Sequence, residues 1–189
     1  MITPKVKETK VILGPCRLSY VHLFEKYVPE GTSEESGKYC ASILIPKSEK
    51  QTIKAIEKAI EAAKKQAIVS KWGGKEPKKL DCVLRDGDED KEDDEIYADK
   101  MFINAKSSSR PGIIDKDKSQ IVDEDEVYSG MWAVVSITFY GYSFSGSNGI
   151  ACYLNNVMKY KDDERFGGHE SAESDFEDVE FDNEDDDDL

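Results

Sequence analysis

Residues 131–144 read MWAVVSITFYGYSF, and this stretch decides the predicted fold. Its residues alternate in character, which is typical of a β-strand whose two faces meet different surroundings. One face carries only apolar side chains, namely Ala133, Val135, Ile137 and Phe139. The other face mixes hydroxyl groups with four aromatic rings and consists of Trp132, Val134, Ser136, Thr138, Tyr140, Tyr142 and Phe144. We therefore expect a strand whose first face lies in the core.

Further strands are predicted on both sides of this stretch. The glycine-rich residues 145–149 indicate a hairpin that leads into a last strand, residues 150–159. Earlier runs of β-forming residues cover 6–13, 39–45 and 101–106, whereas residues 17–27 follow no clear period. About five strands joined mostly by loops favour an antiparallel or mixed sheet, and closure into a small barrel would remove its edges.

One main helix is predicted over residues 48–70. Ser48 and Gln51 have the spacing of a capping box at its start. Apolar residues then recur at helical spacing opposite a face of Lys and Glu; they are Ile53, Ile56, Ala59, Ile60, Ala63 and Ala67. The fold class is thus mainly β with one main helix, whose apolar stripe packs on the core.

Charge is distributed unevenly along the 189 residues. The chain has 40 acidic and 26 basic residues, for a net charge of −14. Residues 170–189 hold 12 acids and no Lys or Arg, and residues 86–95 hold 8 acids beside Lys91. The remainder has 20 acids and 25 bases, so a mildly basic body carries two acidic segments. We expect residues 86–95 to form an exposed, mobile loop between strands.

Several classes of protein are excluded by what the sequence lacks. No run of 18 apolar residues and no apolar signal segment occur, so we expect a cytoplasmic protein, in the host cytoplasm if a phage encodes it. Cys16, Cys40, Cys82 and Cys152 are widely spaced, which favours reduced, mostly buried thiols over a zinc site. The acidic run fails the calcium-loop pattern because Lys91 replaces its glycine. We expect no metal and no cofactor.

The C-terminal segment, residues 166–189, has too few apolar residues to fold, so we predict a disordered acidic tail after a domain of residues 1–165. It could serve as a solubilising tail or as an acidic interaction tail. The candidate partner-binding residues are Phe176, Phe181, Asp185, Asp186, Asp187, Asp188 and Leu189. A tethered polyanion would also compete with nucleic acid for a basic groove and be released for partners when DNA arrives.

The mixed face of residues 131–144 is the candidate functional surface. Exposed aromatic rings stack on nucleic-acid bases, and nearby cations neutralise phosphates. The candidate DNA-binding residues are Trp132, Tyr140, Tyr142, Phe144, Phe102, Lys106, Lys100, Arg110 and Lys159. The alternative is that this face is also buried, in a closed barrel or under residues 107–130. Trp72, which follows the helix among lysines, fits a role on the functional surface and a role in packing at the end of the helix equally well.

Two longer segments resemble the phage single-stranded DNA-binding proteins of OB-fold type. These segments are residues 84–115, with RDGD, FINAKS and RPGI, and residues 149–176, with LNNV, FGG and SAESDF. The resemblance implies an OB-fold barrel that coats single-stranded DNA in replication and recombination and ends in an acidic tail. His169 and the terminal Leu189 depart from the usual pattern, which concerns only the partners of the tail.

We therefore expect a non-enzymatic single-stranded DNA-binding protein whose tail recruits replication or recombination proteins. A nuclease would need a metal or nucleophile cluster on rigid elements, which the sequence does not show. An acidic adaptor or DNA mimic, which binds a replication or recombination enzyme without contacting DNA, is the main alternative. The sequence leaves the choice between monomer and dimer open.

Overall fold

The computed structural model describes residues 1–167. The tail residues proposed to bind partners, Phe176 to Leu189, lie outside the described residues. The strands are β1 (Lys5–Lys7), β2 (Lys10–Tyr27), β3 (Lys38–Pro46), β4 (Asp81–Cys82), β5 (Leu84–Asp86), β6 (Lys100–Ser107), β7 (Gly112–Ile114), β8 (Trp132–Phe144) and β9 (Ser147–Lys161). The helices are α1 (Lys50–Ser70) and α2 (Gly87–Asp90), with 3-10 turns η1 (Glu34–Ser36), η2 (Glu95–Tyr97) and η3 (Glu124–Glu126). Within these residues no helix is long and apolar enough to cross a bilayer.

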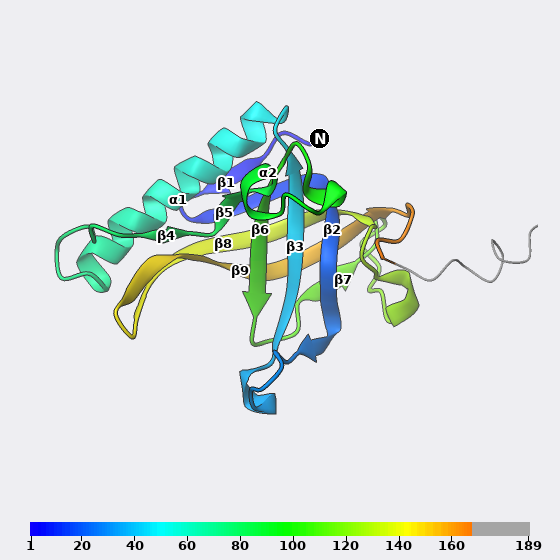
Figure 1. Cartoon of the computed structure of the whole chain (residues 1–189). Coiled ribbons are helices and arrows are strands. Elements are labelled where there is room, and N and C mark those ends of the chain that lie inside the picture. Colours follow the sequence, from blue (N-terminus) through cyan, green and yellow to red (C-terminus); the bar gives the residue numbers. More distant parts are fainter. Residues whose placement is uncertain (168–189) are drawn as a thin grey trace, which may run out of the picture.

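Five of the strands close into a barrel. β2 pairs with β3 and β8, β3 pairs with β6, and β9 pairs with β8, all antiparallel. A parallel bridge between Lys106 of β6 and Tyr153 of β9 completes the ring. In Figure 1 the long β8–β9 hairpin crosses the three steep strands β2, β3 and β6. This order confirms the predicted five-stranded OB-fold barrel with one main helix.

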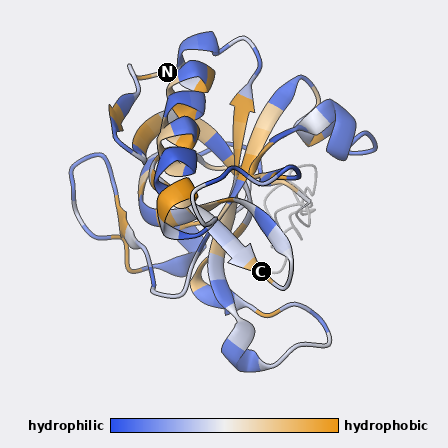
Figure 2. Ribbon diagram, turned by 90° about the vertical axis from the view of Figure 1, so that its left-hand side faces the viewer, coloured by the Kyte–Doolittle hydropathy of each residue, from blue (hydrophilic) through white to orange (hydrophobic). Residues whose placement is uncertain are grey.

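The core lies where the alternation of residues 131–144 predicted it. Ala133, Val135, Ile137 and Phe139 are all buried. They pack with apolar residues of β2, β3, β6 and β9 and with one side of α1. In Figure 2 apolar and polar residues alternate along α1, and apolar residues dominate the strands behind it. Gly141 continues the inward face, and a Cβ there would lie 2.2 Å from Cβ of Ala67, so glycine lets α1 approach β8 closely.

The start of α1 differs from the predicted capping box. The helix begins at Lys50, and its N-cap is Glu49, whose side chain makes no capping hydrogen bond. Ser48 lies one residue too early to cap the helix. The helix is therefore held by its apolar stripe, since Ile56, Ala59, Ile60, Ala63 and Ala67 are buried as predicted.

The acidic residues 86–95 are exposed for the most part but do not form a simple loop. They form α2 and lead into η2. The Asp86 carboxylate accepts a hydrogen bond from the N–H of Asp88, and the Asp88 carboxylate accepts one from the N–H of Asp99, just before β6. Lys47 forms ion pairs of 2.6 and 2.7 Å with the same two carboxylates. These ion pairs therefore hold the segment against the outer face of the barrel.

A second, smaller cluster lies on that outer face and corrects one sequence prediction. Phe102, predicted to be an exposed stacking residue, is only 1% exposed. It packs with Leu44 and with Tyr97 of η2, whose ring meets the Phe102 ring edge-on at 5.0 Å. Because η2 covers this part of β6, an outward-facing side chain becomes a buried one.

Candidate nucleic-acid interface

An open groove of about 340 Å³ lies on the outer face of β2, β3 and β6. Figure 1 shows these three strands side by side. We call this cavity the outer groove; its lining residues are Tyr20, His22, Tyr27, Cys40, Ala41, Ser42, Lys91, Tyr97, Asn104 and Lys106. Three of its four aromatic side chains, if His22 is counted, come from β2, and the fourth comes from η2. The groove is thus assembled from segments far apart in sequence.

Strand register sets the floor of the outer groove. Side chains directly opposite each other on paired strands share a face. His22 pairs with Cys40, and Cys40 pairs with Lys106, so these three form one row across the sheet. Ser42 and Asn104 form the next row. The floor is therefore polar between the aromatic side chains.

Two tyrosines present much of their surface to solvent in this groove. Tyr20 is 57% exposed and Tyr27 is 49% exposed. The register of β2 against β3 shifts between Ser19 and His22, and Tyr20 at that shift has a φ of 48°. Such a bulge re-aims a side chain. The ring of Tyr27 is held by that of His22, with ring centres 5.0 Å apart.

Two lysines supply the positive charge of the outer groove. Nζ of Lys91 lies 5.7 Å from the ring centre of Tyr20 and 5.8 Å from that of Tyr97. The Tyr97 hydroxyl donates a 3.1 Å hydrogen bond to Oγ of Ser42, which fixes the position of the Tyr97 side chain in the groove. Lys106 is exposed and lies in the row of the floor that contains Cys40 and His22. Among the described residues that line the groove there is no Asp or Glu, although the chain has 40 acids.

Three predicted DNA-binding residues lie together on the β8–β9 hairpin. Tyr140 stacks on Tyr153 with ring centres 4.0 Å apart and planes inclined by 18°. Burial, and secondarily the neighbouring Tyr153, raise the pKa of Tyr140 to about 12, so its hydroxyl stays neutral at physiological pH. Tyr142 is half-buried, and Phe144 near the hairpin tip is 77% exposed. Because Tyr153 also pairs with Lys106, this aromatic group adjoins the outer groove.

Lys100 and Arg110, two of the predicted cations, lie away from the outer groove. Lys100 lies six residues from Lys106 on β6, a separation of about 20 Å along a strand. Its Nζ donates to the carbonyl oxygen of Ala98 at 3.0 Å. The guanidinium of Arg110 stacks over the ring of Phe24, with Cζ 4.3 Å from the ring centre. Of the four predicted cations, only Lys106 lines the groove.

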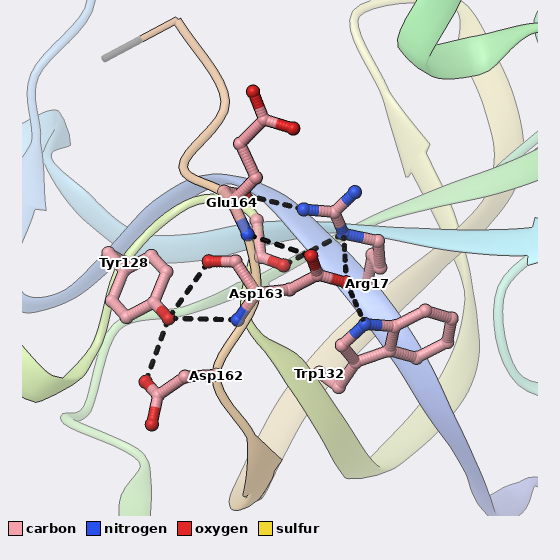
Figure 3. Close-up of polar contacts among 7 residues, drawn as sticks. Arg17, Tyr128, Trp132, Asp162, Asp163 and Glu164 are labelled. Carbon is pink, nitrogen blue, oxygen red and sulfur yellow. Dashed lines mark hydrogen bonds and ion pairs between the residues drawn. The ribbon is translucent and has the colours of Figure 1, made fainter. Parts of the chain in front are cut away.

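Trp132 and Lys159 belong to a different part of the surface, where Trp132 lies beside Asp163 (Figure 3). Nε1 of Trp132 donates a 2.6 Å hydrogen bond to Oδ2 of Asp163. Nζ of Lys159 lies 2.8 Å from Oδ1 of Asp162, and its side chain is only 12% exposed. Both predicted DNA-binding residues are therefore engaged by the segment that follows β9.

The sequence analysis missed Tyr20, His22, Tyr27, Lys91 and Tyr97. The first three lie in residues 17–27, for which no period was found. The inward residues of β2 change parity along the strand, from Leu13 to Leu18 and back to Leu23, with register shifts between them. Aromatic residues at 20, 22 and 27 between two predicted strands were the available signal.

A larger cavity of about 450 Å³ beside β7 is a poorer candidate. Its lining consists of Arg110, Pro111, Gly112, Ile113, Ile114, Gln120 and Ile121. This described lining holds one cation and no aromatic ring, so it offers nothing on which a base could stack. Among residues 1–167, no three His, Cys, Asp or Glu side chains are grouped to hold a metal ion.

The four cysteines are free thiols in several surroundings. Cys16 and Cys152 are buried, which raises the pKa of each thiol. Cys40 is half-buried in the groove floor, and Cys82 is exposed. The expectation of mostly buried thiols therefore fails for Cys82.

Comparisons with known proteins agree with this geometry. Residues 9–189 match the family described as "Enterobacter phage Enc34, ssDNA-binding protein". A protein called p50 from Acyrthosiphon pisum secondary endosymbiont phage 1 is 33% identical over 181 residues, which cover 90% of this chain and 94% of that protein.

Solved structures of phage single-stranded DNA-binding proteins are also similar to this chain. The single-stranded DNA-binding protein from bacteriophage Enc34 in complex with ssDNA is 29% identical, with a TM-score of 0.73, over 86% of this chain and 96% of that one. A single-stranded DNA-binding protein encoded by bacteriophage T7 is 13% identical, with a TM-score of 0.61, over 84% of this chain and 94% of that one, and shows the shared fold alone. The chain therefore belongs to the phage single-stranded DNA-binding protein family that the Enc34 protein represents.

Proposed function

We propose that this protein coats and protects single-stranded DNA during phage replication and recombination, in the host cytoplasm, and that it catalyses no reaction. The observation that carries the proposal is the outer groove, in which exposed tyrosines stand beside lysines without any lining carboxylate. OB folds bind oligonucleotides on the face of their second and third strands, which are β3 and β6 in this barrel.

Binding in the outer groove would combine three interactions. Tyr20 and Tyr27 offer ring faces on which bases stack, whatever their sequence. Lys91 and Lys106, which both line the groove, neutralise phosphates and release counterions. The polar floor, with Asn104 and Ser42, accepts base edges without burying an unpaired group. Together these contacts favour a salt-sensitive interaction with little preference for sequence.

The β8–β9 hairpin would extend the DNA path beyond the groove. Tyr153 connects Lys106 to Tyr140, and Phe144 lies exposed further along the hairpin. We therefore retain Tyr140, Tyr142 and Phe144 as proposed DNA contacts. Replacing Tyr140 or Tyr142 with Ala should weaken binding by about 1–3 kcal/mol if the ring stacks on a base.

The acidic tail is proposed to compete for the outer groove and to recruit partner proteins once DNA displaces it. Its charge supports competition, since residues 170–189 carry 12 acids and no Lys or Arg. The chain also leaves the barrel beside the groove, because Phe166 packs on the cluster that contains Tyr97. Deleting residues 170–189 should tighten DNA binding at low salt, and an unchanged affinity would contradict the competition.

The test of the proposed function is fluorescence anisotropy with a labelled dT oligomer, on the full chain. Lys106→Glu should weaken binding by about tenfold or more, since it places a negative charge in the groove. Lys116→Glu is the matched control, because Lys116 lies beside Tyr160 and does not line the groove. Equal losses of affinity in the two variants would mean that DNA binding depends on the overall charge of the protein and not on the outer groove.

The same experiment separates the alternative functions. An acidic adaptor that never contacts DNA would leave the anisotropy of the dT oligomer unchanged at every protein concentration. A nuclease would shorten the oligomer in the presence of Mg²⁺, which a denaturing gel detects. The proposal expects binding with the oligomer intact.

A further inference from the structure

A cluster of cations and aromatic rings lies where β2 meets β8, and residues 162–166 contact it. Figure 3 shows Arg17 and Trp132 of this cluster beside Asp163 and Glu164. We call these residues the clasp. Arg17 pairs with Trp132 across the two strands, and both side chains contact Asp163. Nε1 of Trp132 is 2.6 Å from one carboxylate oxygen, and Nε of Arg17 is 3.8 Å from the same oxygen. Lys161 adds a second cation, its Nζ 5.1 Å from the Trp132 ring centre.

The clasp presents the chemical groups of a nucleotide to this cluster. The Asp163 carboxylate takes the place that a phosphate would take between a guanidinium and an indole N–H. The ring of Phe166 lies under the Arg17 guanidinium, 4.1 Å from ring centre to Cζ, as a base would stack. Arg17 also donates hydrogen bonds to the carbonyl oxygens of Gly130 and Glu164.

We propose that Arg17, Trp132 and Lys161 form a second nucleic-acid subsite, which the clasp occupies until a longer DNA strand displaces it. This inference rests on the proposed function, since the outer groove is the first subsite. It also gives a role to Trp132, which does not line the outer groove.

The two subsites lie on one continuous face of the barrel. Arg17 pairs with Leu44, Ser19 with Ser42, and His22 with Cys40, so the cluster and the groove are successive rows on β2 and β3. Tyr97 separates them, because it packs with Leu44 and also lines the groove. A DNA strand that is longer than the groove and extends past Lys91 therefore reaches Arg17 next.

The contacts that hold the clasp are of a kind that DNA can replace. The Asp163 and Asp162 side chains are 37% and 72% exposed, and exposed ion pairs contribute little to stability. Residues 162–165 belong to no strand or helix. The phosphates of a bound strand would take over the carboxylate positions, and the released acids would pass into solvent.

The experiment follows the fluorescence of Trp132 in a Trp72→Phe variant of the full chain. Trp72 donates a hydrogen bond to the carbonyl oxygen of Tyr142 from the end of α1, so it is remote from the clasp. Labelled dT oligomers of about 4 to about 16 nucleotides span the site sizes of OB folds. The shortest oligomers should bind without changing Trp132 emission, and longer ones should quench it.

Asp163→Asn in the same background removes the charge that mimics phosphate. It should move the onset of quenching to shorter oligomers and tighten binding of the longest oligomer about 2–5-fold, the equivalent of one exposed ion pair. Asp117→Asn is the matched control, since it makes the same charge change in the turn after β7. Arg17→Lys keeps the charge but loses the planar stacking group, so it should weaken binding of the longest oligomer only.

The outcomes separate this inference from the proposed function. Tight dT binding with Trp132 emission constant at every length would overturn the second subsite and leave the outer groove intact. Identical behaviour of Asp163→Asn and Asp117→Asn, with both variants folded by circular dichroism, would overturn it as well. No binding at any length would refute both proposals.

Discussion

Truncating the groove tyrosines tests the stacking argument most directly. Tyr20→Ala and Tyr27→Ala each remove a ring that is about half exposed, at 57% and 49%. Base stacking on an aromatic side chain contributes about 1–3 kcal/mol per base. Each variant should therefore raise the Kd for a dT oligomer by about 5-fold to about 150-fold. Tyr27 should lie toward the upper end, because its contact with His22 holds the ring in place before DNA arrives.

The stability of the two variants should change little, which separates binding from folding. Neither ring is part of the buried core, and Ala at position 20 meets the same backbone strain at φ 48° as Tyr does, so each substitution should change the unfolding free energy by about 0.5 kcal/mol or less. Tyr160→Ala is the matched control, since Tyr160 is 41% exposed and lies outside the groove. If the rings stack on different bases, the double variant should lose the sum of the two free energies.

The assay is fluorescence anisotropy with a labelled dT oligomer at low salt, with thermal unfolding followed by circular dichroism. The reasoning would be refuted if Tyr20→Ala and Tyr27→Ala bound as tightly as Tyr160→Ala while all three melted alike. A loss of affinity in only one of the two variants would instead mean that DNA stacks only on the tyrosine replaced in that variant.

Three further predictions concern salt, packing and pH. Lys91→Ala and Lys106→Ala should each reduce the slope of log affinity against log salt by roughly 0.7, measured by anisotropy from low to high salt. Phe102→Ala should lower the free energy of unfolding by about 3–5 kcal/mol in urea titration, because the ring is buried against Leu44 and Tyr97, so any effect on DNA is indirect. The hydrogen bond from Trp132 holds the pKa of Asp163 below its ordinary value of 3.8, so the stability it gives the clasp is present above that pH and is lost as pH falls below it. Trp132 emission in the Trp72→Phe variant should change over that acid range, and Asp163→Asn should abolish the change.

The barrel was predictable where one alternation runs unbroken through a strand. From Ala133 to Phe139 every second residue points inward and is buried, so a simple period reveals the core face. The same holds for the apolar stripe of α1, although Glu49, and not Ser48, occupies the N-cap. Local periodicity and burial coincide in β8 because both register shifts of the β8–β9 pair place the extra residue on β9, which leaves the alternation of β8 unbroken.

The outer groove was not predictable because its strand changes phase. β2 shifts register between Leu13 and Cys16 and again between Ser19 and His22. Each shift moves the following side chains to the other face, so no single period describes the strand. Burial on the outer face depends on covering segments as well, since η2 brings Tyr97 onto Phe102 from a stretch whose acidic composition indicates only exposure. Contacts of this kind follow from the tertiary arrangement.

The net charge of −14 argues against DNA binding only if charge is averaged over the molecule. Within residues 1–167 the ion pairs engage Arg17, Lys47, Lys64, Arg85 and Lys159. Lys91 and Lys106 have no carboxylate among these pairs, so their charges remain available to phosphate. At physiological salt the Debye length is about 8 Å, and acids beyond that range are largely screened from the groove. The charges that DNA meets within this range are the groove lysines and the acids that flank Lys91, so a charge reversal at Lys106 should outweigh the same reversal at Lys116.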